Sequence, residues 1–359
     1  MSKAAELAKA GETLTNQPSG RKNIVINGGM QISQRATSTT GVGNASGYFG
    51  PDRWKIHKDA TTAGRLTMTQ STDAPAGFAN SLKMDCTTAD TSIAAGERLN
   101  LGCSIEGFDL QHIKKGTSAA LPMTLTFYVK GDQTATYNVE VGDFDNNRCF
   151  YKRFAVTTSW NKITIAIPAD TTGAFNNDNG ESIALGFWLN AGATYNGGTF
   201  VEDAWSTYAA NVRSHSSNTQ FFDSTDREFF ITGIQLEVGS QATNFEHRSR
   251  GEELALCQRY FQRKSDGMAT CSNTTTALSS FEFRHVMRGN PTFSQEAVLG
   301  ITNGSAWDKT QSSVSAAIIA GRVSTFGVQL AFGNFSSLTQ YQPVAINNSG
   351  GDILIDADM

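Results

Sequence analysis

The sequence is poor in charge and has no long apolar run, and each shortage excludes a class of protein. Charged residues make up 17% of the 359 positions, against a usual share of about 25%. The 29 basic residues are outnumbered by 33 acidic ones, so no basic face is expected for the phosphates of a nucleic acid. No apolar run approaches 18 residues, which predicts that the chain does not insert into a membrane.

Cysteine and signal-peptide patterns are also missing. The five cysteines form no CxxC pair, which excludes the usual zinc and thioredoxin-like motifs; they are Cys86, Cys103, Cys149, Cys257 and Cys271. The first residues, MSKAAELAKAGE, have no apolar centre of the kind that a secretory signal carries. We therefore expect free thiols in a protein synthesised in a reducing cytosol.

Small polar residues and turn formers are abundant instead. The chain holds 39 Thr, 32 Ser, 24 Asn and 34 Gly, together with 22 Phe and only 7 Pro. Thr and Phe favour strands, and Gly and Asn favour the turns between them. The length fits two domains of ordinary size. The sequence thus predicts a mainly β protein.

The pattern along the chain divides it into four segments. Residues 1–22 hold a short helix and a Gly/Pro/Ser linker, which suits a docking peptide better than a core element. From residue 23 to residue 248, apolar residues alternate with polar ones, which predicts a β-sandwich or jelly roll. The expected strands are Asn23–Asn27, Arg53–Lys58, Arg65–Gln70, Ser81–Asp85, Met123–Lys130, Thr136–Phe144, Lys162–Ile167, Ser182–Asn190 and Glu228–Val238.

A helix and a second β domain are expected to follow. Ser249 and Glu252 have the spacing of a capping box, which predicts a connecting helix over residues 249–264. Its apolar side chains either pack on the chain's own sandwich or form an oligomer interface; they are Leu254, Cys257, Tyr260 and Phe261. Residues 265–359 carry only four basic and seven acidic side chains. This smaller C-terminal β domain is expected to face an assembly, because interface cores are depleted in charge.

Three motifs carry a family resemblance. They are NIVINGGMQISQR with PDRW, at residues 23–35 and 51–54; ITGIQLEVGSQATNFEHRS, at residues 231–249; and EELALCQRYF, at residues 252–261. In this order the motifs resemble the tail fibre, or receptor-binding, proteins of tailed bacteriophages, whose jelly-roll domain is similar to a carbohydrate-binding module. The physical interpretation of the motif residues is structural, with Trp54 expected as a core anchor.

The resemblance implies a role on the surface of a virion. The chain would be a homotrimer, attached to other tail proteins through the helix that carries Leu7 and Ala8, and would bind a glycan of the host surface. Two alternatives stay open. The first is a head fibre or capsid decoration protein, or another structural component of the virion, that touches no receptor. The second is a glycan depolymerase.

Residues 186–212 and their flank offer candidate glycan contacts. Aromatic side chains gather there in a stretch rich in Gly, Asn and Thr, and sugar sites combine apolar faces with a few polar groups. The candidates are Tyr195, Trp205, Tyr208, Asn196, Asp203 and Arg213. The alternative for this stretch is that its aromatic residues, Trp188 among them, belong to the core or to an interface.

Evidence for metal binding or catalysis is slight. Asp143, Asp145 and Asn147 have a D-x-D-x-N spacing that hard cations such as calcium favour, but Arg148 stands where an EF-hand needs glycine. A plain solvated turn is the alternative. The chain has no HExxH, no GxSxG and no P-loop, and carboxylate pairs are too common to identify a glycosidase. We expect no catalytic residue and no cofactor, apart from a structural calcium as an alternative for this loop.

Overall fold

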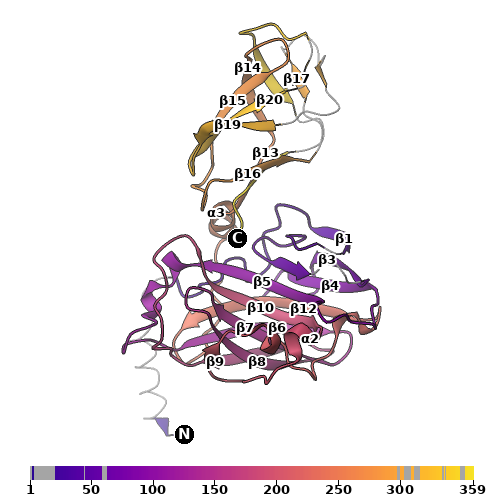
Figure 1. Cartoon of the computed structure of the whole chain (residues 1–359), viewed down its shortest axis with the longest axis vertical. Coiled ribbons are helices and arrows are strands. Elements are labelled where there is room, and N and C mark those ends of the chain that lie inside the picture. The colour runs from indigo at the N-terminus through magenta and orange to yellow at the C-terminus, as the bar shows by residue number, and fades with distance from the viewer. Residues whose placement is uncertain are drawn as a thin grey trace. The chain divides into compact units, whose positions relative to one another are not determined.

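The computed structural model describes residues 2–3, 21–43, 45–58, 63–296, 300–302, 309–310, 316–333, 335, 337–347 and 352–359. The chain forms two compact units, Met1–Glu253 and Leu254–Met359. Both are built from antiparallel strands with few helices (Figure 1), which confirms the predicted mainly β fold. The predicted anchoring residues Leu7 and Ala8 lie outside the described residues.

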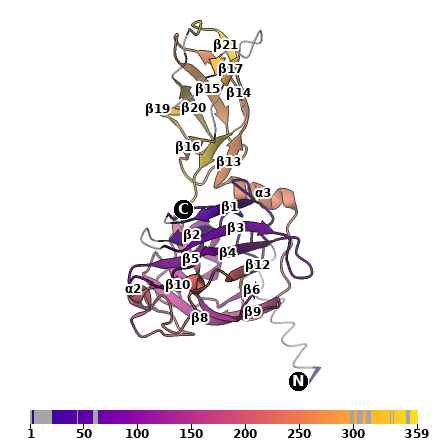
Figure 2. The same ribbon diagram turned by 90° about the vertical axis from the view of Figure 1, so that its right-hand side faces the viewer.

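The first unit is a sandwich of two six-stranded sheets (Figure 2). The first sheet has the order β1 (Ser38–Val42), β3 (Arg65–Ser71), β4 (Ser81–Thr88), β12 (Glu228–Val238), β6 (Met123–Gly131) and β9 (Asn161–Ile167). The second has the order β11 (Ser206–Thr207), β8 (Arg148–Val156), β7 (Ala135–Asp143), β10 (Glu181–Ala191), β5 (Arg98–Glu106) and β2 (Lys55–Lys58). One apolar cluster from both sheets fills the space between them.

Short helices lie in the connections of this unit. They are the four-residue α2 (Ala193–Asn196) and the 3-10 turns η1 (Gly107–Asp109), η2 (Gln111–Ile113), η3 (Ala210–Val212) and η4 (Phe221–Asp223). Strand β5 shows which side chains of the second sheet point into the core and which lie on its outer face. Leu99 and Leu101 point into the core and are fully buried, so Asn100 and Gly102 lie on the outer face of the same strand, as the twofold strand period requires.

The segment Asn23–Asn27 is not the regular strand that the alternation predicts. Its backbone is buried, but side chains take many of its hydrogen bonds. The Asn23 Oδ1 accepts from the backbone nitrogens of Val25, at 3.0 Å, and Leu236, at 3.2 Å. Asparagine side chains can replace backbone groups as hydrogen-bond partners. The apolar residues between Asn23 and Asn27 therefore form an irregular segment whose backbone is partly bonded by side chains.

The predicted connecting helix is shorter than residues 249–264. Helix α3 spans Arg250–Gln258, and its capping box forms as expected, with the Ser249 nitrogen donating to Glu252 Oε2 at 2.9 Å. Phe261–Lys264 form strand β13 instead, paired with β22 (Ile353–Asp356). Pairing with a distant strand decides the conformation of these residues, because intrinsic helix propensity is weaker than the contacts of the folded protein.

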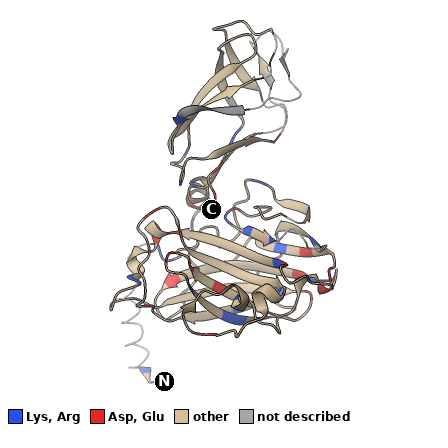
Figure 3. Ribbon diagram, in the orientation of Figure 1, with Lys and Arg blue, Asp and Glu red and all other residues tan. Residues whose placement is uncertain are grey.

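The second unit holds a three-stranded and a seven-stranded sheet. The order in the first is β13, β22 and β16 (Thr292–Gln295). In the second it is β18 (Lys309–Thr310), β17 (Gly300–Thr302), β21 (Pro343–Asn347), β14 (Asp266–Cys271), β15 (Ala277–Glu282), β20 (Gly327–Phe332) and β19 (Ala316–Val323). A separate apolar cluster forms its core. Figure 3 shows few charged residues on its ribbons, in agreement with the charge count of the sequence.

Candidate functional site

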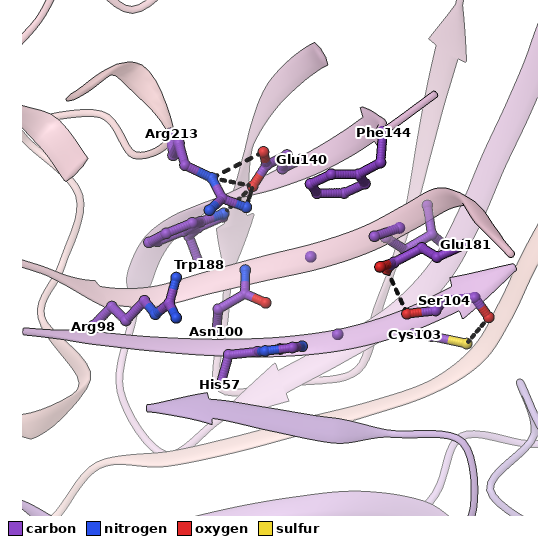
Figure 4. Close-up of a pocket in the computed structure, with 14 residues that line it drawn as sticks. His57, Arg98, Asn100, Cys103, Ser104, Glu140, Phe144, Glu181, Trp188 and Arg213 are labelled. Atoms are coloured by element: carbon purple, nitrogen blue, oxygen red, sulfur yellow. Dashed lines mark hydrogen bonds and ion pairs between the residues drawn. The ribbon is translucent and has the colours of Figure 1, made fainter. Parts of the chain in front are cut away.

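The outer face of the second sheet carries a hollow of about 210 Å³. Strands β2, β5, β7 and β10 place its walls, and Figure 4 shows the lining side chains. The polar and aromatic residues that line it are His57, Arg98, Asn100, Ser104, Glu140, Phe144, Glu181, Trp188 and Arg213. All of the strands involved are neighbours in one sheet, so the backbone holds these side chains in fixed register.

Glycines in the middle of two strands create the hollow. Gly102 of β5 and Gly186 of β10 are direct partners in the ladder. A Cβ atom on Gly186 would lie 2.6 Å from Asn100 Nδ2, and one on Gly102 would lie 3.0 Å from His57 Nε2. A glycine inside a strand often marks a place where another group approaches closely. Here the two glycines form a floor on which Asn100 and His57 can lie.

Asn100 supplies an unused hydrogen-bond donor to the hollow. The residue is only 5% exposed, and its Nδ2 has no hydrogen-bond partner in the protein. An unsatisfied buried donor costs about 1–3 kcal/mol, and such groups in native proteins usually have a role. The amide is therefore placed to donate to a ligand in the hollow.

Glu181 supplies an acceptor at the other end of the floor. Its Oε1 accepts a hydrogen bond of 2.6 Å from the Ser104 hydroxyl. The Ser104 carbonyl in turn accepts 2.7 Å from the Arg53 guanidinium, beyond the point where β2 stops pairing with β5. The arginine of the PDRW motif thus takes the place of a missing strand beside Ser104.

Glu140 has protein partners on both oxygens. Trp188 Nε1 donates to its Oε2 at 2.6 Å, and Arg213 Nε donates to Oε1 and Oε2 at 3.0 Å each. The Arg213 guanidinium lies 4.7 Å from the Trp188 ring centroid. Burial acts to lower the pKa of Arg213, but the charge and hydrogen bonds of Glu140 outweigh it and raise that pKa. Glu140 therefore fixes the tryptophan and the arginine.

Of the six predicted glycan contacts, Arg213 lines the hollow and the other five do not. Trp205 packs against the core and donates from Nε1 to the Pro168 carbonyl at 2.8 Å. The Tyr195 ring lies 5.3 Å from that of Trp188, and the Tyr208 ring lies 5.2 Å from the Arg213 guanidinium.

The two remaining predicted contacts have other partners. Asn196 Nδ2 donates to the Ala191 carbonyl at 2.8 Å, and Asp203 pairs with Lys152 at 2.6 Å. Of the predicted residues outside the lining, Tyr195 and Tyr208 therefore contact Trp188 and Arg213 of the hollow. The residues that sequence reasoning missed are His57, Asn100, Phe144 and Glu181; the strand-interior glycines of NLGCS and ALGFW were the signal for them.

The predicted metal loop is held by a lysine and by amides. Lys115 Nζ lies 2.5 Å from Asp143 Oδ2, and both side chains are buried. Asp145 accepts a hydrogen bond of 2.7 Å from Asn176 Nδ2. Asn147 adopts a left-handed backbone conformation, with a φ of 54°. Among the described residues, no group of three or more His, Cys, Asp or Glu side chains gathers to hold a metal. The ammonium of Lys115 supplies the positive charge that a cation would bring, so Asp143 is not a free ligand.

Three of the four predicted oligomer contacts are covered within the single chain, and the oligomer interface stays a prediction. Cys257, Tyr260 and Phe261 are at most 1% exposed within the single chain, and Leu254 is half-buried. Phe261 lies in the ladder with β22, which is why it is covered. These side chains leave little free surface for a second copy. The five cysteines are all free thiols, as expected, and all are buried.

Comparison with known proteins finds likeness in solved structures alone. No protein-family model matches the chain, and no curated protein matches it. A structure described as CBM4 has 12% identity and a TM-score of 0.30, covering 59% of this chain and 97% of its own. The family 11 carbohydrate-binding module of cellulase Lic26A-Cel5E from Clostridium thermocellum has 10% identity and a TM-score of 0.28, covering 56% and 99%.

A phage protein is also similar. The enzymatically active domain of tailspike protein 4 from bacteriophage CBA120 has 11% identity and a TM-score of 0.30, and the match covers 60% of this chain and 21% of that one. These are remote likenesses, so the functional conclusion rests on the hollow itself. In the described part of the chain, no helix is both long and apolar enough to span a membrane.

Proposed function

We propose that the first unit binds a glycan in the hollow on the β5–β10 face. The observation that carries this proposal is the buried Asn100 amide, whose Nδ2 lies over a glycine floor without a partner. Glu181 and Ser104 add polar oxygens at the other end, and Phe144 adds an aromatic wall. Apolar walls with a few convergent polar groups are typical of small-ligand sites, and the hydroxyls and ring faces of a sugar match both.

Binding without hydrolysis fits this arrangement better than catalysis does. Glycoside hydrolysis needs two available carboxyl groups about 5–10 Å apart. Of the two that line the hollow, Glu140 is held by Trp188 and by Arg213. Glu181 is then left without a second carboxylate as its partner. Incubation of the protein with a bound polysaccharide should release no new reducing ends.

The biological setting that we propose is the surface of a phage particle. The motif order NIVINGGMQISQR, PDRW, QLEVGSQATNFEHR and EELALCQRYF supports a tail fibre or similar appendage that attaches to a host glycan. A homotrimer held to tail proteins by residues 1–22 would multiply weak single-site binding through several linked copies. An electron-microscopy map of the intact particle tests this setting: density on the capsid would favour a decoration protein instead.

The binding test uses native gels that contain soluble polysaccharides, from plant glucans and galactans to bacterial capsule and lipopolysaccharide preparations. The wild type should be retarded by at least one of them. Asn100→Ala removes the free donor, and Gly186→Ala places a methyl group against it. Each change should weaken binding about tenfold, the effect of losing roughly 1.4 kcal/mol, without lowering the melting temperature by more than a few degrees.

The matched control is Gly96→Ala, because a Cβ atom there would meet nothing within 4 Å. This variant should bind as the wild type does. Unchanged binding by Gly186→Ala would place the glycan elsewhere on the molecule. A wild-type protein that none of the polysaccharides retards would reject glycan binding itself.

A further inference from the structure

Two phenylalanines of the first unit are exposed although most others are buried. Phe108 is 54% exposed and Phe144 is 46% exposed. Only one other phenylalanine of the described chain, Phe326 of the second unit, is exposed to a similar extent. Exposed aromatic rings are costly in water and often mark a binding surface.

The backbones of both residues lie near the start of strand β10. The Phe108 nitrogen donates to the Asp178 carbonyl at 2.9 Å, just before β10 begins, and the Phe144 nitrogen donates to the Ser182 carbonyl at 3.1 Å. Phe108 follows β5 and Phe144 follows β7, and β10 lies between these two strands. The two residues therefore flank β10 on opposite sides. Phe144 also lines the hollow, with Cε2 2.9 Å from the place of a Cβ on Gly142.

The hollow is long for its small volume. Its lining runs along β10 from Trp188 to Glu181, which is roughly 20 Å at about 3.3 Å per residue. Its volume of about 210 Å³ is below the roughly 300–1,000 Å³ of a site that encloses a drug-sized ligand. A ligand that follows its whole length must therefore lie partly outside it.

We propose that the site takes a linear chain of several sugar units running along β10, with Phe144, at the Glu181 end of the hollow, and Phe108 stacking on the units that leave it. This inference rests on the proposed glycan binding and deepens it. Asn100 and Glu181 hold the units inside the hollow, and the two rings hold the next ones. The ligand is then an internal stretch of a polysaccharide and not a single terminal sugar.

The test is isothermal titration with oligosaccharides of one to six units, prepared from the polysaccharide that retards the wild type most strongly. Affinity should rise with chain length. Phe144→Ala and Phe108→Ala should each weaken binding of the longest oligosaccharide about five- to tenfold, the effect of one lost stacking contact. Binding of the shortest oligosaccharide that still binds should change less than twofold.

Two further variants make the test specific. Phe144→Trp keeps an aromatic face and should retain wild-type affinity for the long chain. Phe326→Ala removes an equally exposed ring from the second unit and should change nothing. Equal affinity of the wild type for short and long oligosaccharides, or an unaffected Phe144→Ala and Phe108→Ala pair, would overturn the inference while the proposed function stands. Failure of the wild type to bind any polysaccharide would overturn both.

Discussion

Lys115 is a buried charge of the first unit. Its ammonium lies 2.5 Å from Asp143 and 3.1 Å from Asp170, and it donates to the carbonyls of Thr172 and Gly173. Burying a charge is costly unless it is paired and hydrogen-bonded. This ion cluster therefore joins the segment after η2, the end of β7 and the segment after β9 through one side chain.

The pH dependence of stability should report on this cluster. Burial acts to raise the pKa of Asp170, but hydrogen bonds from Arg148, from the Thr172 nitrogen and from Lys115 outweigh it and hold that pKa below its usual 3.8. The stability that the carboxylate contributes is therefore present above pH 4, and is lost as the pH falls through the lowered folded-state pKa.

Asp170→Asn should then lower the free energy of unfolding at pH 7 by about 3 kcal/mol, the effect of breaking a buried pair. The difference from wild type should be smaller at pH 2, because below pH 3.8 the unfolded wild-type chain binds the proton more readily than the folded one and stability is lost. Urea unfolding followed by circular dichroism at both values measures it. Asp226→Asn, at an exposed position, is the control and should have little effect. A difference that stays constant with pH would contradict the assigned role of Asp170.

Single residues of the candidate site were only partly predictable. Aromatic side chains predicted Tyr195, Trp205 and Tyr208 as glycan contacts, but none of the three lines the hollow, and Trp205 packs against the core. Asn100 and Glu181 gave no local signal, since the hollow exists only once β5 and β10 pair in the observed register. Gly102 and Gly186 were the sequence signal for the hollow, because glycine weakens the interior of a strand and often marks the close approach of another group.

Among the elements, the segment Asn23–Gln34 explains the first family motif. Asn27 Nδ2 donates to the carbonyls of Ile32 and Asp52, and its Oδ1 accepts from the Ile32 nitrogen at 3.0 Å. Trp54 is fully buried, as expected, and donates to the Asn27 carbonyl at 3.1 Å. The asparagine thus ties together NGGMQIS and PDRW, which lie more than 20 positions apart.

An ion pair joins the second and third motifs, and hydrogen bonds join both of them to the backbone of the first. Glu253 Oε1 accepts from the Asn27 nitrogen at 2.5 Å and lies 3.2 Å from the Arg248 guanidinium. Arg248 also pairs with Glu246 and donates to the carbonyls of Val25 and Asn23. Motifs that are separated in the sequence therefore form one polar network that connects three parts of the chain.

Asn27 offers a test of this network. Its φ of 58° is left-handed, a conformation that asparagine tolerates and alanine does not. Asn27→Ala should cost about 3 kcal/mol of unfolding free energy, through orphaned buried groups and backbone strain. Asn27→Gly loses the same side chain without the strain and should be about 1 kcal/mol more stable than the alanine variant. Equal stability of the two variants in urea would argue against the backbone component.

The prediction of strands succeeded where alternation was clean. Expected strands at Arg65–Gln70, Met123–Lys130 and Glu228–Val238 are confirmed by β3, β6 and β12. Strands β5 and β8 were missed, because RLNLGCSIE is interrupted by glycine and RCFYKRFAV carries three basic residues. Both gain their stability from neighbours in the sheet, which local patterns do not record.

At the scale of the whole molecule, both units place a late strand in the middle of a sheet. In the first unit β12 lies between β4 and β6, and in the second β22 lies between β13 and β16. In each unit, these are the last strands in sequence. Pairings over such long sequence separations make folding slow compared with local contacts.

Removal of β22 should therefore disrupt the second unit alone. A chain that ends after Asn347 lacks the strand that joins β13 to β16, and limited proteolysis should degrade it to a fragment close to Met1–Glu253. A chain that ends after Ala357 keeps β22 and is the control, which should resist the protease at full length. Loss of both units, or of neither, would contradict the division of the chain into separately cored units.

The central position of β12 and β22 also sets an order on synthesis. As the ribosome releases the chain, the first sheet of the sandwich cannot be completed before Glu228–Val238 emerge. The three-stranded sheet of the second unit cannot be completed before Ile353–Asp356 emerge. The glycine floor of the hollow lies on strands that emerge earlier, but the opposite sheet of the sandwich is completed only by β12. A chain released without Ile353–Asp356 would likewise hold a finished first unit and an unfinished second one.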